Sequence, residues 1–262
     1  MTDEILRPSD EQISFFQREG YVILENWISE EMVERLRAII DIEIERVHRQ
    51  MDKLGKDISG INHRDSRYFI PHNHERHQAA LDHTFGPEME GVCRSFLGDE
   101  VQLFLDQLLI KAPMKGNQPG LKFGWHQDAG YISHSRPEYL TCWTALDEMS
   151  EENGTVRVLP LPRMDSPGPV DHVMEEGSND MIGYHGDDPG ILAIVPAGSV
   201  VVFSSYTFHC SGPNLTSRQR RAYLTQYSKE PIMNQEGTGL HIKAVPFLEK
   251  GEKVCPEEVV SI

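Results

Sequence analysis

Hydrophobic spacing divides the chain into a helical first part and a strand-rich second part. From about residue 9 to residue 97, apolar residues recur every three or four positions, which is the spacing of one helix face. From about residue 101 to residue 228, short runs of alternating apolar and polar residues end at Gly, Pro or Asn. Helices followed by a series of short strands predict an α+β protein, with helices against a β-sandwich or β-barrel. The chain has no internal repeat or linker, so we expect a single domain over residues 1–262.

The ends of several elements can be placed from their capping residues. Ser9 or Asp10 can cap a first helix, and glycines can end the first and second helices. In the first part, the expected elements are a helix ending at Gly20, a strand at 21–27, a helix from Ser29 to about Leu54 and a helix at 87–97. In the second part, the expected strands are 101–113, 139–147, 154–160, 191–196, 199–204 and 221–228.

Two long segments lack a clear period and are expected to be loops. Residues 60–85 contain several histidines, but their irregular spacing favours a solvated loop over a metal site, and we expect this loop to cover the barrel mouth. Its candidate substrate contacts are Asn62, Arg64 and His72. Residues 162–190 are polar and rich in Gly and Pro, which is typical of a lid over a binding site. The candidate contacts there are Asp171, His172 and His185.

Composition narrows the class of partner. The chain has 262 residues, 39% hydrophobic and 25% charged, as in a soluble globular protein. A net charge of −16 argues against nucleic acid as a partner and also weakens the case for an acyl-CoA substrate, which carries phosphates. We find no apolar run long enough to span a membrane and no signal-peptide pattern. The four scattered cysteines are interpreted as reduced thiols, and the protein is expected to be cytoplasmic.

Two histidines and one aspartate form the most informative candidate site. His126 and Asp128 are two positions apart, so in a strand both side chains point to the same side. His209 follows an apolar run that would form another strand. Two imidazoles and one carboxylate on one face of a small barrel are the ligand set of non-haem Fe(II), which leaves positions open for other ligands.

One arginine suggests what would share the iron. Arg220 follows His209 in the run HCSGPNLTSRQRRAYLTQYS, and in a strand it faces the opposite side from Arg221. A guanidinium group offers a planar fork of donors that matches a carboxylate. A dicarboxylic co-substrate could chelate the iron through a keto-acid end and place its far carboxylate on Arg220.

With these motifs the sequence resembles the phytanoyl-CoA dioxygenase-like group of Fe(II)/2-oxoglutarate-dependent oxygenases. The resemblance rests on FFQREGYVILENWIS (15–29), WHQDAGY (125–131), YLTCWTALDEMSEENGTVRVLP (139–160), VPAGSVVVFSSYTFHCSGPN (195–214) and Arg220. It implies a double-stranded β-helix (a cupin-like jelly roll), with N-terminal helices packed on one sheet and the β-helix core at about 101–228. The chain departs from the family after Pro160, where LPRMDSPGP replaces the usual Gly-Ser-His turn.

The resemblance also implies roles for individual residues. His126, Asp128 and His209 would bind Fe(II), and Arg220 would anchor 2-oxoglutarate. Further co-substrate contacts would come from Ser211, Gln107 and Trp143, and Tyr131 is a candidate for lining the substrate pocket.

The implied reaction is hydroxylation of an unactivated C–H bond in a small metabolite, with O2 and 2-oxoglutarate consumed and succinate and CO2 released. Related halogenases lack the carboxylate ligand, so Asp128 favours hydroxylation. The alternatives are the same chemistry on an acyl-CoA and desaturation, cyclisation or epimerisation. A zinc hydrolase with the same ligands and a non-catalytic jelly-roll binding protein are further alternatives, and the oligomeric state stays open.

Overall fold

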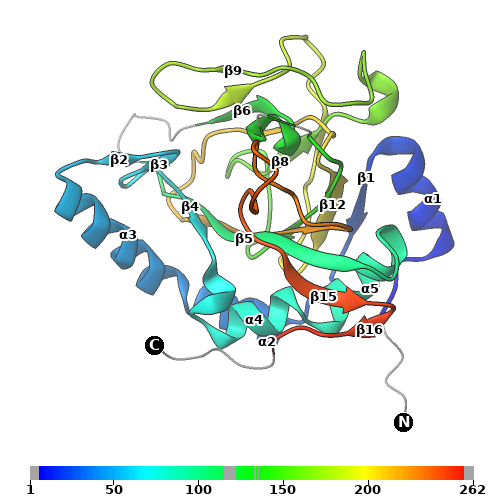
Figure 1. Cartoon of the computed structure of the whole chain (residues 1–262). Coiled ribbons are helices and arrows are strands. Elements are labelled where there is room, and N and C mark those ends of the chain that lie inside the picture. Colours follow the sequence, from blue (N-terminus) through cyan, green and yellow to red (C-terminus); the bar gives the residue numbers. More distant parts are fainter. Residues whose placement is uncertain (1–5, 115–121, 133, 135, 257–262) are drawn as a thin grey trace.

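The computed structural model describes residues 6–114, 122–132, 134 and 136–256. Figure 1 shows helices below a large sheet and a smaller group of strands above it. The helices are α1 (Asp10–Glu19), α2 (Glu30–Arg37), α3 (Ile40–Leu54), α4 (Gln78–Thr84) and α5 (Pro87–Phe96), with short 3-10 turns η1 (Asn73–Glu75), η2 (Asp128–Tyr131) and η3 (Leu161–Arg163). No helix of the described chain is both long and apolar enough to cross a bilayer.

The large sheet lies between the helices and the smaller group of strands, and its paired strands are antiparallel. Its main path runs β1-β12-β7-β14-β5-β4-β3-β2, while β15 pairs with β5 and with β16. The strands are β1 (Tyr21–Leu24), β12 (Val200–Ser204), β7 (Leu140–Ala145), β14 (Arg220–Ser228), β5 (Val101–Lys111), β4 (Arg67–Pro71), β3 (Asn62–His63), β2 (Ile58–Ser59), β15 (Val245–Glu249) and β16 (Glu252–Lys253). Strand β5 is the longest, and it pairs with β14 along one edge and with β4 and β15 along the other.

A smaller sheet faces the large one. It has the order β11-β8-β13-β6, and a hairpin of β9 and β10 lies beyond it. The strands are β11 (Ile191–Leu192), β8 (Val156–Val158), β13 (His209–Ser211), β6 (Phe123–His126), β9 (Val173–Met174) and β10 (Met181–Ile182). Two facing antiparallel sheets make the jelly roll that the sequence predicted.

Two apolar cores explain why the helices lie on only one face of the large sheet. The first core joins the helices to the outer face of the large sheet, with Leu36, Met51 and Met89 against Val202 and Tyr223. The second core lies between the two sheets and includes Trp143, Val201 and Leu224 from the large sheet and Val156 and Val158 from the small one. Strand β7 is buried along its whole length because both of its faces are covered.

A buried carboxylate fixes α3 to the segment before α4. Glu43 accepts hydrogen bonds from Arg76 at 2.9 and 3.0 Å and from Arg46 at 2.8 Å, and its Oε1 lies 2.8 Å from Nε2 of His77. Burial alone would raise the pKa of Glu43, but the hydrogen bonds from these basic side chains outweigh it and lower the pKa to about 2.

Several boundaries differ from those predicted. The first helix is capped by Ser9 and ends at Gly20 in the left-handed region, as predicted. The helix expected at 29–54 is instead two helices, because Ala38 and Ile39 form a turn between them. The strand expected at 21–27 ends at Leu24.

Both predicted loops contain regular structure. Residues 60–85 hold β3, β4, η1 and α4, and three of the histidines there, His63, His74 and His83, are buried rather than solvated. Residues 162–190 carry the short hairpin of β9 and β10. The sheet also extends past residue 228, because β15 pairs with β5.

Candidate metal centre and co-substrate pocket

Three elements bring the candidate metal ligands together. His126 is the last residue of β6, and His209 is the first residue of β13, directly opposite it in the antiparallel pairing. Asp128 opens η2, because the chain leaves the strand after His126. The expectation that His126 and Asp128 share one strand is therefore wrong, although the turn still brings both side chains together. All three side chains are buried, and their candidate ligand atoms lie within 4.8 Å of one another.

Backbone carbonyls orient both imidazoles. Nδ1 of His126 donates to the carbonyl of Gly124 at 2.8 Å, and Nδ1 of His209 donates to the carbonyl of Thr207 at 3.0 Å. Each ring therefore keeps the lone pair of Nε2 for a ligand. The Nε2 atoms lie 3.8 Å (His126) and 3.5 Å (His209) from Oδ1 of Asp128. The other carboxylate oxygen, Oδ2, accepts a hydrogen bond from the hydroxyl of Thr141 at 2.6 Å.

The protonation states suit a divalent cation. Burial, reinforced by the nearby His209, lowers the pKa of His126 to about 3. Burial would raise the pKa of Asp128, but His209 and the other neighbours outweigh it and lower the pKa to about 2. At neutral pH the site therefore offers a neutral imidazole and an ionised carboxylate, the forms that bind metal.

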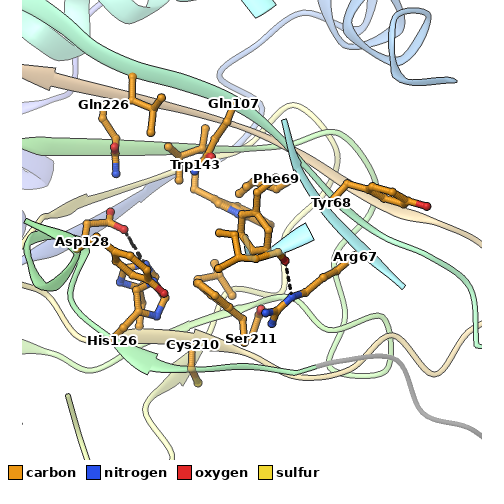
Figure 2. A pocket seen from close by; sticks show the side chains of 18 of the residues that line it. Arg67, Tyr68, Phe69, Gln107, His126, Asp128, Trp143, Cys210, Ser211 and Gln226 are labelled. Atoms are coloured by element: carbon orange, nitrogen blue, oxygen red, sulfur yellow. Dashed lines mark hydrogen bonds and ion pairs between the residues drawn. The ribbon is translucent and has the colours of Figure 1, made fainter. Parts of the chain in front are cut away.

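The triad opens into a cavity of about 250 Å³ between the two sheets. Figure 2 shows Asp128 and His126 at the left of this cavity, Gln107 and Trp143 at the top of the view and Ser211 below them. Tyr131 also lines the cavity, and its hydroxyl accepts a hydrogen bond from the amide of Met181 at 3.3 Å. Aromatic and aliphatic side chains form most of the wall.

Arg220 lies in the same cavity with unpaired donors. Its side chain is 3% exposed, and neither Nε nor Nη1 has a hydrogen-bond partner. The guanidinium lies over the ring of Trp143, 5.7 Å from its centroid. Burial lowers the pKa of Arg220 to about 10, so the group stays charged at neutral pH. A buried cation with orphaned donors is costly unless a ligand pairs with it, and a carboxylate has the right charge and shape.

Two further cations stand beside Arg220. Lys111 is opposite Arg220 on β5, and Arg67 is opposite Lys111 on β4. Lys111 donates to the carbonyls of Ser211 and Gly212, and burial followed by its two arginine neighbours holds its pKa well below the usual range. These three basic side chains lie at one end of the cavity, where Arg67 is neutralised by its buried ion pair with Asp180.

Comparison with known proteins supports the chemistry of this site. Residues 16–222 match the family described as Phytanoyl-CoA dioxygenase (PhyH). The chain belongs to this phytanoyl-CoA dioxygenase family. The rat peroxisomal phytanoyl-CoA dioxygenase is 24% identical over 261 residues, covering 93% of this chain and 75% of the relative. The ectoine dioxygenase of Bordetella bronchiseptica is 25% identical over 263 residues, covering 89% and 80%.

A solved structure shows the same fold. The epimerase SnoN, in complex with Fe3+, alpha ketoglutarate and nogalamycin RO, superposes with a TM-score of 0.63 at 18% identity and covers 95% of this chain and 96% of that one. Proteins of this family use iron and 2-oxoglutarate. In this chain, the His-Asp-His triad fits the iron, and the unpaired donors of Arg220 fit a carboxylate of 2-oxoglutarate.

Not every predicted substrate contact reaches the cavity of this family member. Asn62 accepts a hydrogen bond from the amide of Phe69 at 2.6 Å and, with His72, lines a separate small pocket near α3. Arg64 is ion-paired with Asp57 at 2.8 Å and with a second carboxylate, which lies on α3. The structure thus places Asn62, Arg64 and His72 outside the cavity that holds the triad, because their side chains contact β4, α3 and the turn after α3 instead.

The candidates on the 162–190 segment also lie outside the cavity. His172 accepts a hydrogen bond from the amide of Gln127 at 2.9 Å, which fixes the segment to the turn between the two metal ligands. Asp171 is paired with Arg136 at 3.0 Å. His185 lines a hollow on the far side of β6. The segment therefore contacts the turn that carries Asp128 and does not line the cavity itself.

Three side chains at the site were not singled out from the sequence. Thr141 bonds the carboxylate ligand, Gln226 donates to Thr141 at 3.3 Å, and Lys111 lies beside Arg220. All three face the cavity on strands β5, β7 and β14. The alternation of those strands marks the inward face, but only the pairing register shows which of its residues meet.

Proposed function

We propose that this protein is an Fe(II)- and 2-oxoglutarate-dependent oxygenase that hydroxylates an unactivated C–H bond of a small organic molecule and releases succinate and CO2. The observation that carries the proposal is the pair of unpartnered donors on buried Arg220, in the same cavity as a His-Asp-His triad. A metal site alone would fit a zinc hydrolase as well, but a hydrolase would give this arginine nothing to bind.

Each group of residues has a defined task. His126, Asp128 and His209 would hold the iron, and Thr141 would keep the carboxylate turned toward it. Arg220 would bind the far carboxylate of 2-oxoglutarate, as a planar fork of donors suits that group. When bound, the iron and 2-oxoglutarate together supply the activation of O2. The apolar walls between the sheets would keep water from the reacting centre.

The carboxylate ligand favours hydroxylation. Asp128 occupies the place that a halogenase leaves open for a halide, and its side chain is buried and hydrogen-bonded. The relatives named as dioxygenases support oxygenase chemistry at this site. Cyclisation and epimerisation use the same ligands, and one structural neighbour is an epimerase, so product analysis is needed to separate these outcomes.

The test is an anaerobic titration with Fe(II) and then with 2-oxoglutarate, followed by visible absorption. Wild type should develop the charge-transfer band of an iron-bound keto acid, and Asp128→Ala should not. Arg218→Ala is a matched control, because Arg218 is exposed and precedes β14. Succinate release that depends on 2-oxoglutarate and O2 would then separate an oxygenase from a hydrolase or a binding protein. Absence of the band in iron-loaded wild type would refute the proposal.

A further inference from the structure

The strand register separates the two ends of the cavity. Arg67, Lys111 and Arg220 are cross-strand neighbours on β4, β5 and β14, and we name them the cationic end. Six positions along β5 from Lys111, Leu105 is opposite Gln226 on the neighbouring strand. At about 3.3 Å per residue, this separation is about 20 Å, so a short dicarboxylate held at the cationic end does not fill the other end.

The far end is built from aromatic and aliphatic side chains. We name it the aromatic end, and it comprises Phe104, Leu105, Ile132, Tyr139, Gln226 and His241. Phe104 packs against Tyr139 with ring centroids 5.2 Å apart, and it stacks on His241 at 6.2 Å with an angle of 22° between the rings. Burial, together with His134, lowers the pKa of His241, so this ring is uncharged at neutral pH.

No described residue of the aromatic end carries a charge. Among the described residues that line the cavity, the one carboxylate is Asp128, a metal ligand, and Gln226 is linked to it through Thr141. Figure 2 shows Gln226 and Asp128 on the side of the cavity opposite Arg67. An amide is thus the most polar group that faces a molecule in this part of the cavity.

Apart from Arg220, which the proposed function assigns to 2-oxoglutarate, two cations at or beside the cavity are paired with carboxylates. Arg67 holds Asp180 through both of its terminal nitrogens, and both side chains are 1% exposed. Lys243, which follows a lining residue, is paired with Glu75. Within the described part of the chain, these groups offer no free positive charge for the phosphates of a coenzyme A thioester.

These observations concern the substrate class of the proposed oxygenase and rest on that function. We propose that the aromatic end binds an uncharged, ring-bearing substrate, which packs against the rings of Phe104 and Tyr139 and accepts or donates one hydrogen bond at the amide of Gln226. A carboxylate or ammonium group placed there would lose its hydration without gaining a partner. A flat ring can pack face-on against one of these two rings and edge-on against the other, since their planes are inclined by 53°.

Three probes that share one ring system test this inference by calorimetry. They are 2-naphthol, 2-naphthoate and 2-naphthylmethylammonium, titrated anaerobically into the Fe(II)–2-oxoglutarate holoenzyme at neutral pH. We expect the neutral probe to bind at least about tenfold more tightly than either ion, because the ions would be desolvated without a partner. Binding of either ion as tightly as the naphthol, or no binding of any probe, overturns the proposal.

Two variants locate the probe. Leu105→Arg places a cation at the aromatic end and should shift the preference toward naphthoate, whereas Ile194→Arg, at a position 63% exposed on the surface, should leave the order unchanged. If Leu105→Arg does not fold, Phe104→Ala should weaken naphthol binding by about tenfold through loss of the aromatic contact surface. An unchanged naphthol affinity in Phe104→Ala contradicts the assignment. The charge-transfer band, measured without a probe, separately decides whether the proposed function itself fails.

Discussion

Removal of the Arg220 guanidinium is the perturbation with the clearest expected magnitude. The side chain is buried and has two donors without partners, so a bound carboxylate would form charge-assisted hydrogen bonds away from water. Truncating one member of such a buried pair costs about 2–5 kcal/mol. Arg220→Ala should therefore raise the dissociation constant of 2-oxoglutarate by about 30-fold to a few thousandfold.

The assay is the anaerobic titration of Fe(II)-loaded protein with 2-oxoglutarate. Arg220→Lys keeps the charge but not the fork, so its affinity should fall between those of wild type and Arg220→Ala. Arg218→Ala should behave as wild type, because that side chain is exposed. A dissociation constant for Arg220→Ala close to that of wild type would refute the assignment of Arg220 as the anchor.

The free energy of unfolding gives an independent check, because removing the guanidinium should weaken 2-oxoglutarate binding but should not destabilise the ligand-free protein. In the ligand-free protein the desolvated guanidinium lacks partners, so Arg220→Met, which keeps an apolar side chain in place, should be as stable as wild type or more stable. Excess 2-oxoglutarate with Fe(II) should stabilise wild type against unfolding and the variant much less. Equal stabilisation of both proteins would contradict the proposed ion pair.

Three further predictions concern the support of the site and the fold. Thr141→Val removes the hydrogen bond to Asp128 and should weaken Fe(II) binding by about 10–100-fold in an anaerobic metal titration, whereas unchanged affinity would deny Thr141 this role. Asp180→Asn leaves buried Arg67 without its counter-charge and should lower the free energy of unfolding in urea by about 3–5 kcal/mol, and a negligible loss would count against the ion pair. Glu43→Gln should cost about 3 kcal/mol at pH 7, because the pKa of Glu43 is depressed from 4.5 to about 2. This contribution is complete above pH 4.5 and is lost as the pH falls toward 2, so urea titrations of the two proteins should converge in acid, and a constant difference would exclude the linkage.

Local patterns predicted the elements whose ends are marked by their own residues. The capping box at Ser9 and the left-handed glycine at 20 lie within or next to α1, so the sequence shows them directly. The break between α2 and α3 has no such marker. Ala38 and Ile39 both keep right-handed helical angles, and the stripe of apolar residues continues across them. Only the packing of each helix on the sheet distinguishes two helices from one.

Residues 60–85 were wrongly predicted to be a solvated loop because a charged side chain in this segment is buried against a partner far away in the sequence. Arg67 begins β4 and looks like a solvated residue in the sequence, yet it is 1% exposed. Its counter-charge, Asp180, is 113 residues away along the chain. A short strand that carries a buried arginine cannot be recognised until the fold supplies the carboxylate.

The same division applies to the candidate site. His126, Asp128 and Arg220 were found because their residue types and spacing suggest chemistry without any knowledge of pairing. Thr141 and Gln226 have ordinary residue types, and their part in the site arises from the register of β7 against β14. Sequence reasoning reached the ligands but not the residues that orient them.

The register of β14 therefore determines both ends of the cavity. A slip by one residue would exchange Arg220 for Arg221 in the cavity and turn Gln226 outward, because side chains alternate between the faces. The observed register keeps Arg221 outside, where it is paired with Asp147 at 3.0 Å. Beyond the pair of Gln226 and Leu105, a bulge leaves Phe104 as an extra residue of β5, so that Tyr227 is opposite Leu103 and both pack in the core between the large sheet and the helices. The bulge thus lets the consecutive residues Phe104 and Leu105 both line the cavity beside the amide that we assign to the substrate, whereas Leu103 turns to the helix side of the sheet.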